Sequence, residues 1–167
     1  MKQDCGKLEL LFIRINEDSP KHSTALKLER LGLAKRISTR HYYRRKVVLL
    51  DPFADTLLTR DERGISGIIV VDRSWKKMLD DRRVPAPRGR VVRRRLPEAK
   101  ASNPINYSKL GILSSAEAFA LALITLCCFE RAYEVLSKFK WGPMFLELNN
   151  DIIETTRKRC SASSSEG

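Results

Sequence analysis

A carboxylate and a large aromatic ring stand three positions apart in the stretch VVDRSW, as Asp72 and Trp75. A carboxylate behind an apolar run can position a cationic ligand, and it can act as a general base where its surroundings raise its pKa. A tryptophan ring offers a flat apolar surface against which a ligand can pack. The structural alternative is that Asp72 caps a helix over SWKKML and that Trp75 belongs to the core, and the pattern alone slightly favours it.

A second polar group lies in ASNPINY, where Asn103, Asn106 and Tyr107 precede one of the most apolar segments of the chain. Two amides and a phenol can recognise a ligand or can brace a turn. Ser114 and Glu117, which follow, have the spacing of a capping box, so we interpret Glu117 as a helix cap rather than as an acid. The residue types leave the role of the two amides open.

Other kinds of site lack support in the sequence. The eight glycines form neither GxGxxG nor GxxxxGK[ST], which argues against an ordinary Rossmann cofactor site or a P-loop. Paired metal-ligand spacing is absent from the cysteines and histidines, which are Cys5, Cys127, Cys128, Cys160, His22 and His41. We therefore expect reduced thiols and no metal site. No run reaches the ~18 apolar residues of a membrane span, and no signal-peptide pattern opens the chain, so we expect a cytoplasmic protein.

The positive charge is concentrated in one part of the chain. Residues 1–100 carry 25 Lys and Arg against 13 Asp and Glu, while residues 101–167 carry seven of each. An excess concentrated in this way favours a polyanionic partner such as RNA over mere solubility, although a solvated basic face remains the alternative. The basic residues that we expect to contact RNA are Lys21, Lys27, Arg60, Arg88, Arg90, Arg93 and Arg94.

Hydrophobic periodicity predicts an α/β fold for residues 1–97. Nearly continuous apolar runs at 7–15, 46–52 and 67–72 are typical of strands that are covered on both faces. A helical pattern at 23–33 separates the first two, and strand, helix, strand indicates a parallel sheet. With a short strand at 34–38 and another at 90–96, we expect about five strands, with ligands at their carboxyl ends.

After Pro97 the pattern becomes helical. Segments 114–129, 130–142 and 143–159 have the apolar content, Gly142 stop and Pro143 start of successive helices, and the first is long enough only for a buried core helix. We therefore expect an N-terminal sheet domain over 1–97, an all-helical C-terminal domain over 98–160, and a disordered tail over 161–167.

Six stretches together resemble a known family. VVDRSW, RRLP, ASNPINY, EAFALAL and LSKFKWGPMFLELN occur in that order after DSPKHSTALKL, and the resemblance spans about residues 17–153. These blocks are similar to those of the ribosomal small-subunit (16S/18S) RNA aminocarboxypropyltransferases. The resemblance implies transfer of the 3-amino-3-carboxypropyl group of S-adenosylmethionine to N3 of a uridine or pseudouridine, often already methylated at N1. It also implies a SPOUT-like parallel sheet with a deep trefoil knot, action on the small subunit during ribosome biogenesis, and a chain that we expect to work as a monomer.

The chain departs from the family pattern at a few positions. Ala25 and Ser108 stand where the family has glycine, and Arg73 stands where it has cysteine. An aromatic residue of some members is replaced by Gly111 or a neighbour. The two lost glycines raise the question of positive backbone φ, which glycine reaches at little cost.

The resemblance also implies roles for individual residues. The expected cofactor-binding residues are Thr24, Val70, Asp72, Ser74, Trp75, Leu96, Gly111 and Ser115. Trp75 would bury the cofactor methyl group and Asp72, the expected catalytic residue, would position the methionine part or the uridine, or act as base. Asn103 and Asn106 would then brace the pocket wall. Two alternatives keep the basic face: a SPOUT-like RNA methyltransferase, and a non-catalytic RNA-binding assembly factor.

Overall fold

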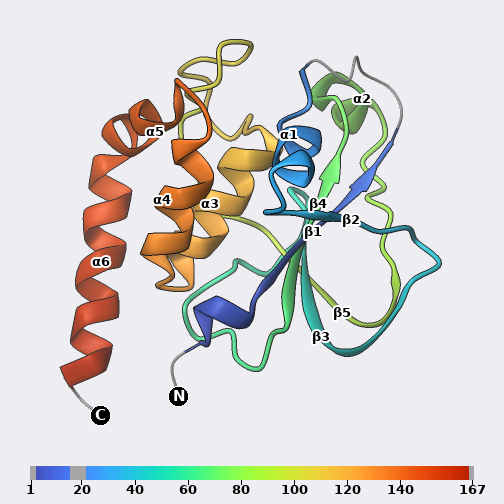
Figure 1. The fold of residues 1–167 in the computed structure, drawn as a ribbon, viewed down its shortest axis with the longest axis horizontal. Coiled ribbons are helices and arrows are strands. Elements are labelled where there is room, and N and C mark those ends of the chain that lie inside the picture. Colours follow the sequence, from blue (N-terminus) through green and yellow to red (C-terminus); the bar gives the residue numbers. More distant parts are fainter. Residues whose placement is uncertain (1–2, 16–21, 166–167) are drawn as a thin grey trace.

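The computed structural model describes residues 3–15 and 22–165, and it has a parallel five-stranded sheet beside a group of helices (Figure 1). The strand order is β2-β1-β4-β3-β5, and every pair is parallel, as the strand, helix, strand pattern predicts. The strands are β1 (Glu9–Arg14), β2 (Lys35–Arg36), β3 (Tyr42–Leu50), β4 (Gly67–Asp72) and β5 (Arg88–Arg94). The short strand expected at 34–38 and the one expected at 90–96 are both present, as β2 and β5.

The central strands contain continuous apolar stretches because both faces of the sheet are covered there. Alternate residues of a strand point to opposite faces. On one face Phe12 and Ile68 pack in the larger core with α1 and α3, while on the other Leu11 and Ile69 pack in a smaller core with Val84. Continuous burial of this kind explains why β1, β4 and residues 47–50 of β3 lack the apolar and polar alternation of a half-exposed strand. Strand β3 begins at Tyr42, before the apolar run expected at 46–52, and its first half is largely exposed.

The helices are an N-terminal 3-10 turn, two short helices within the sheet part, and four later ones. They are η1 (Cys5–Lys7), α1 (Thr24–Arg30), α2 (Trp75–Asp80), α3 (Ser115–Thr125), α4 (Phe129–Ser137), α5 (Gly142–Leu148) and α6 (Asn150–Ser165). Helix α3 contacts β4 and α1 on one side and α4 and α6 on the other, so it lies between the sheet and the outer helices (Figure 1). Helix α6 continues to Ser165, so residues 161–165 of the expected tail are helical.

The expectation of reduced cysteines is wrong. Cys5 is bonded to Cys128 and Cys127 to Cys160, with Cα atoms 5.5 Å and 5.8 Å apart. The bonded cysteines are 123 and 33 positions apart in sequence. The short-range cysteine spacing that argues against a metal site therefore cannot show whether such distant cysteines meet in the fold. The fold brings η1 and α6 to the link between α3 and α4, and the two bridges tie both ends of the chain to that link.

Candidate functional site

A cavity of about 560 Å³ opens at the carboxyl ends of β3, β4 and β5. Ligands of parallel α/β sheets bind at this edge, and the volume suits a cofactor-sized molecule. Its wall combines strand ends, helix α2 and the irregular segment 97–114. All eight residues expected to bind the cofactor lie in this wall: Thr24, Val70, Asp72, Ser74, Trp75, Leu96, Gly111 and Ser115.

Asp72 ends β4 and is held by three side chains. Arg14, its register partner on β1, places Nη1 2.8 Å from Asp72 Oδ2, and the Ser23 hydroxyl donates to the same oxygen at 2.7 Å. Ser115 Oγ lies 3.5 Å from Oδ1. The Arg14 side chain is only 6% exposed, so these contacts hold the Asp72 carboxylate in a fixed position.

Sequence reasoning missed Arg14 and Ser23. One signal was available for Arg14, because it is the only charged residue within the apolar run LLFIRI and buried charges are paired. Ser23 has two roles, since its oxygen also accepts from Leu26 N at 3.1 Å as the N-cap of α1. The helix that follows β4 is capped by Ser74 rather than by Asp72, with Ser74 Oγ accepting from Lys77 N at 3.2 Å.

Trp75 and Thr24 join the sheet part to the segment around the start of α3. The indole Nε1 of Trp75 donates to the carbonyl of Leu113 at 2.7 Å. The hydroxyl oxygen of Thr24 accepts from the backbone N–H of Ala116 at 2.9 Å. The cavity therefore has walls from two parts of the chain that are hydrogen-bonded to each other across it.

Glu117 organises the wall formed by residues 101–114. Its carboxylate is fully buried and accepts hydrogen bonds from the backbone and hydroxyl of Ser102, from Asn103 Nδ2, and from the backbone and hydroxyl of Ser114, at 2.6–3.1 Å. The bonds with Ser114 form the capping box of α3, as the sequence predicts. Asn103 Oδ1 also accepts from Asn106 N at 3.1 Å, so Asn103 braces the loop.

The two lost glycines differ in their backbone. Ser108 has φ of 67°, in the left-handed region that favours glycine, and its N–H donates to Ala101 O at 2.6 Å. Ala25 lies within α1 and is fully buried. The family glycine at position 108 therefore has a conformational reason here, while the helical Ala25 needs no positive φ.

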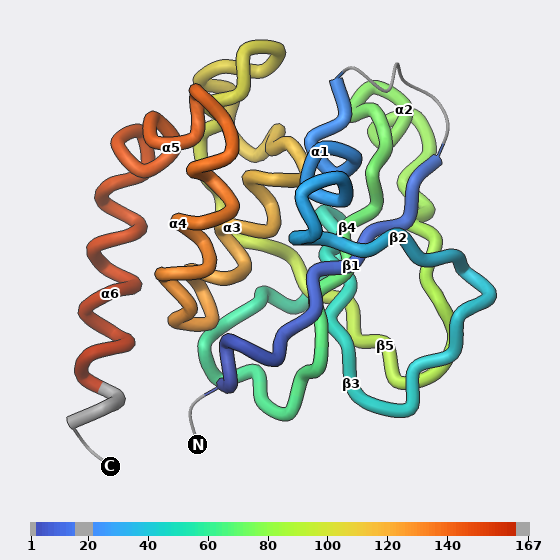
Figure 2. The backbone as a smooth tube through the Cα atoms, viewed as in Figure 1, coloured from blue at the N-terminus to red at the C-terminus, as the bar shows by residue number. Residues whose placement is uncertain are grey.

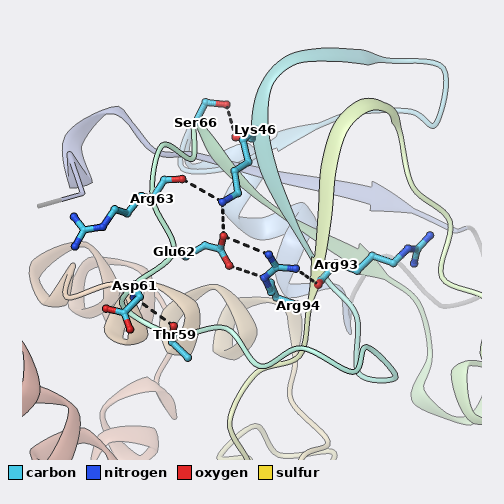
Figure 3. A network of polar contacts seen from close by, with 8 residues as sticks. All are labelled: Lys46, Thr59, Asp61, Glu62, Arg63, Ser66, Arg93 and Arg94. Atoms are coloured by element: carbon cyan, nitrogen blue, oxygen red, sulfur yellow. Dashed lines mark hydrogen bonds and ion pairs between the residues drawn. The ribbon is translucent and has the colours of Figure 1, made fainter. Parts of the chain in front are cut away.

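Two of the arginines expected to contact RNA form ion pairs inside the protein. Arg93 Nη1 lies 3.0 Å from Asp51 Oδ2. Arg94 Nε lies 2.5 Å from Glu62 Oε1, and Figure 3 shows this second pair. Lys46 completes the network around Glu62. Partial burial would raise the pKa of the Glu62 carboxyl, but hydrogen bonds from Arg94 and Lys46 outweigh it and lower the pKa below its ordinary value.

The other basic residues of that prediction are placed differently. Arg60 donates to the carbonyl of Arg159, and the Lys27 ammonium lies 4.8 Å from the centre of the Phe139 ring. Arg88 and Arg90 are exposed on β5. Lys21 lies outside the described residues. Arg88 Nη2 also donates to a carbonyl, that of Arg40, at 3.3 Å. Of the predicted RNA contacts within the described residues, Arg90 is therefore the best placed for a phosphate.

Among residues 3–15 and 22–165 there is no group of three or more His, Cys, Asp or Glu side chains with the arrangement of a metal site. Within the same ranges, no helix has both the length and the apolar character needed to cross a membrane.

Comparison with known proteins identifies the family. Residues 48–165 match the family model described as ribosome biogenesis protein, C-terminal. The 16S rRNA aminocarboxypropyltransferase of Thermoplasma acidophilum is 41% identical over 89% of this chain and 90% of its own length, and that of Vulcanisaeta distributa is 38% identical over 87% and 80%. The solved structure of the SAM-dependent rRNA:acp-transferase Tsr3 from Vulcanisaeta distributa superposes with a TM-score of 0.79 at 36% identity, covering 89% of this chain and 82% of that one. These matches confirm the resemblance, and the chain belongs to the 16S rRNA aminocarboxypropyltransferase family.

Proposed function

We propose that this protein transfers the 3-amino-3-carboxypropyl group of S-adenosylmethionine to a uridine-type base of small-subunit ribosomal RNA. One observation carries the proposal: in a chain of this family, the eight residues expected at the cofactor site all line one cavity at the strand ends. The relatives are named 16S rRNA aminocarboxypropyltransferases, and the related Vulcanisaeta distributa structure is of a SAM-dependent rRNA:acp-transferase.

The cavity has the chemistry that this cofactor requires. Asp72 supplies a fixed negative charge for an ammonium group, and the indole of Trp75 with Val70 and Leu96 supplies apolar surface for a methyl group and a purine. S-adenosylmethionine supplies a sulfonium that activates the carbons attached to it. Which carbon reacts then depends on which one faces the nucleophile. Trp75 selects the propyl carbon by covering the methyl group.

Asp72 serves this reaction by position. The Arg14 pair and the Ser23 hydrogen bond hold Oδ2, while Oδ1 has a longer contact, 3.5 Å to Ser115 Oγ. We assign Oδ1 to the ammonium of the cofactor's amino acid part. Thr24 and Ser115 flank the same end of the cavity, and the backbone of Ser74 and Gly111 completes the wall.

The calorimetric test of this placement uses the two tryptophans of the chain. Trp75 is half-buried and would cover the cofactor methyl group, so Trp75→Ala removes apolar contact surface and should weaken S-adenosylmethionine binding about tenfold or more. Trp141→Ala is the matched control, because Trp141 stacks on Phe139 among the outer helices, 4.8 Å between ring centres. Equal affinities in two folded variants would contradict the assignment of Trp75 to the methyl group.

The test of the reaction is the product. Small-subunit RNA incubated with the protein and S-adenosylmethionine should yield, after digestion, a uridine-type nucleoside carrying the aminocarboxypropyl group. A methylated nucleoside would instead make the protein a methyltransferase, and an unmodified RNA that is nevertheless bound would make it an assembly factor.

Finer features of the same proposal concern the target and the chain. We assign the transfer to N3 of a pseudouridine, N1-methylated or not, or of a uridine. We infer that the protein works as a monomer, since one chain supplies the whole described cavity wall, and acts in the cytoplasm on the small subunit during its biogenesis. Sedimentation of the protein with RNA tests the monomer, and a dimeric species would contradict it.

We also infer a SPOUT-like trefoil knot with a helical C-terminal part. The bonds from Trp75 to Leu113 and from Thr24 to Ala116 support it, because they hold the start of α3 against the sheet loops. When the reduced protein is pulled from its two ends, its final length should be less than about 3.6 Å per residue, because the residues inside a tightened knot do not extend. Extension to the full length would contradict the knot.

A further inference from the structure

A second, basic cavity lies where strand β3 bulges against its neighbour β5. Its volume is about 360 Å³, and the charged side chains in its wall are Lys7, Arg45, Lys46, Arg90 and Asp4. Lys46 is paired with Glu62 and Asp4 with Lys7. Arg45 and Arg90 are exposed, and they approach the cavity from two different strands. The cavity therefore has a net positive wall to which two exposed guanidinium groups contribute.

The bulge arises because β3 has more residues than β5 between two paired positions. Tyr43 pairs with Gly89 and Val47 pairs with Val91, so residues 44–46 of β3 face only Arg90 of β5. Extra residues in one strand bend it and redirect its side chains. Arg44 and Arg45 are both exposed at this bend. Bulges of this kind are features that re-aim side chains rather than defects of a sheet.

Gly89 is required for the bulge. It has φ of 98°, and a Cβ at this position would lie 2.2 Å from the carbonyl oxygen of Tyr43. No other residue fits without parting the two strands. The chain therefore keeps a backbone arrangement open only to glycine at the point where its exposed arginines gather.

The bulge is remote from the cofactor cavity. Arg45 precedes Leu50, which lines that cavity, by five residues, or about 16 Å along a strand at ~3.3 Å per residue. Figure 2 shows β3 and β5 bending together at the lower end of the molecule, while α2 and the segment before α3 lie at the upper end. A ligand bound at the bulge therefore lies away from the cofactor cavity and from the nucleotide that reacts there.

We propose that this bulge, formed by Arg44, Arg45 and Arg90 around Gly89, grips the phosphate backbone of the substrate RNA away from the target nucleotide. Guanidinium groups match phosphate oxygens and carry no sequence information, so the grip fixes the position of the RNA on the enzyme while the pocket takes the base. The proposal rests on the proposed function, which makes RNA the substrate. It assigns the anchoring of that RNA to the bulge rather than to Arg93 and Arg94, which are ion-paired.

The direct test compares two double variants with equal charge loss. Arg45→Ala with Arg90→Ala should reduce affinity for small-subunit RNA, measured without cofactor over a range of salt. Each lost phosphate contact flattens the slope of log affinity against log salt concentration by about 0.7–0.9. For two lost contacts, the ratio of wild-type affinity to variant affinity should therefore be roughly 40-fold larger at 0.1 M salt than at 1 M salt. The control, Lys138→Ala with Lys140→Ala, removes two exposed lysines near the end of α4 and should leave affinity and slope unchanged.

A third variant separates geometry from charge. Gly89→Ala keeps every arginine but displaces the strands, so it should also weaken RNA binding while affinity for S-adenosylmethionine stays at the wild-type value. If this variant does not fold, the two double variants still decide. In the transfer reaction, loss of Arg45 and Arg90 should raise KM for RNA by a larger factor than it lowers kcat, because neither residue lines the cofactor cavity.

Two results would overturn the proposal. One is an Arg45 and Arg90 variant that binds RNA with the affinity and salt slope of the Lys138 and Lys140 control. The other is normal binding to naked RNA combined with weaker binding to assembled small-subunit particles, which would assign the bulge to an acidic protein surface. Wild-type protein that binds RNA but transfers nothing would refute the proposed function and leave the grip to be judged by affinity alone.

Discussion

Replacing Glu117 by glutamine should loosen the wall of the cofactor cavity. The carboxylate is fully buried and each of its oxygens accepts from at least two donors. An amide has only one acceptor oxygen, so its NH₂ group must face donors. The least damaging orientation puts the NH₂ against Ser102, where the hydroxyl can turn to accept but the backbone N–H cannot.

The magnitude follows from that one unsatisfied N–H and from the loss of charge. A buried donor without a partner costs about 1–3 kcal/mol, and hydrogen bonds to a charged group contribute about 1.5–3 kcal/mol. We therefore expect Glu117→Gln to lower the free energy of unfolding by roughly 2–4 kcal/mol. Because Asn103, Asn106 and Ser114 line the cavity, affinity for S-adenosylmethionine should fall as well.

The assay is urea denaturation together with calorimetry of cofactor binding. Glu147→Gln is the matched control, because Glu147 is an exposed glutamate on α5 and such a change is usually worth no more than about 0.5 kcal/mol. The reasoning is refuted if the two variants unfold at the same urea concentration and bind the cofactor equally well.

Four more outcomes are expected. Asp72→Asn should lower the free energy of unfolding by about 3 kcal/mol, because it removes a negative charge 2.8 Å from the buried Arg14 guanidinium; denaturation equal to wild type would contradict this contact. Ser108→Gly should raise that free energy by about 0.5 kcal/mol, since relief of the left-handed backbone exceeds the added chain entropy, and a loss in denaturation experiments would contradict it. Because the pKa of Glu62 is lowered in the folded protein, its ionised form stabilises the fold above the unfolded pKa of about 4.3, and this stabilisation is lost as pH falls through the folded pKa. The difference in free energy of unfolding between wild type and Glu62→Gln should therefore be constant above about pH 5 and should shrink below about pH 4. A difference that does not change with pH would exclude the network. Reduction should cost about 2–4 kcal/mol for each disulfide, with Cys160→Ser isolating one of them, and an unchanged unfolding transition would contradict both bridges.

The sheet could be predicted from sequence because its signals are local. β1, β4 and residues 47–50 of β3 are continuous apolar runs, and the capping box of α3 lies within four residues. The first half of β3, YYRRK, has no such apolar signal. The helical start of Thr24–Arg30 is likewise encoded by the neighbouring Ser23. Each of these features depends on residues a few positions apart, which periodicity and capping rules detect directly.

The parts that sequence could not provide depend on register between distant segments. Arg14 meets Asp72 because β1 and β4 are parallel neighbours, and Arg94 meets Glu62 across 32 positions. Charge counting assigned Arg93 and Arg94 to RNA, and it could not show the carboxylates of Asp51 and Glu62 with which the fold pairs them. The bulge at Tyr43 and Gly89 was also hidden, because unequal strand lengths appear only once two strands are paired.

The most direct test of the central claim follows the two halves of the cofactor separately. S-adenosylmethionine carrying one isotope in the methyl group and another in the aminocarboxypropyl chain is incubated with the protein and small-subunit RNA. The chain label should enter RNA while an equal amount of the methyl label is released in methylthioadenosine. Methyl label in the RNA, with the chain label recovered in S-adenosylhomocysteine, would contradict it.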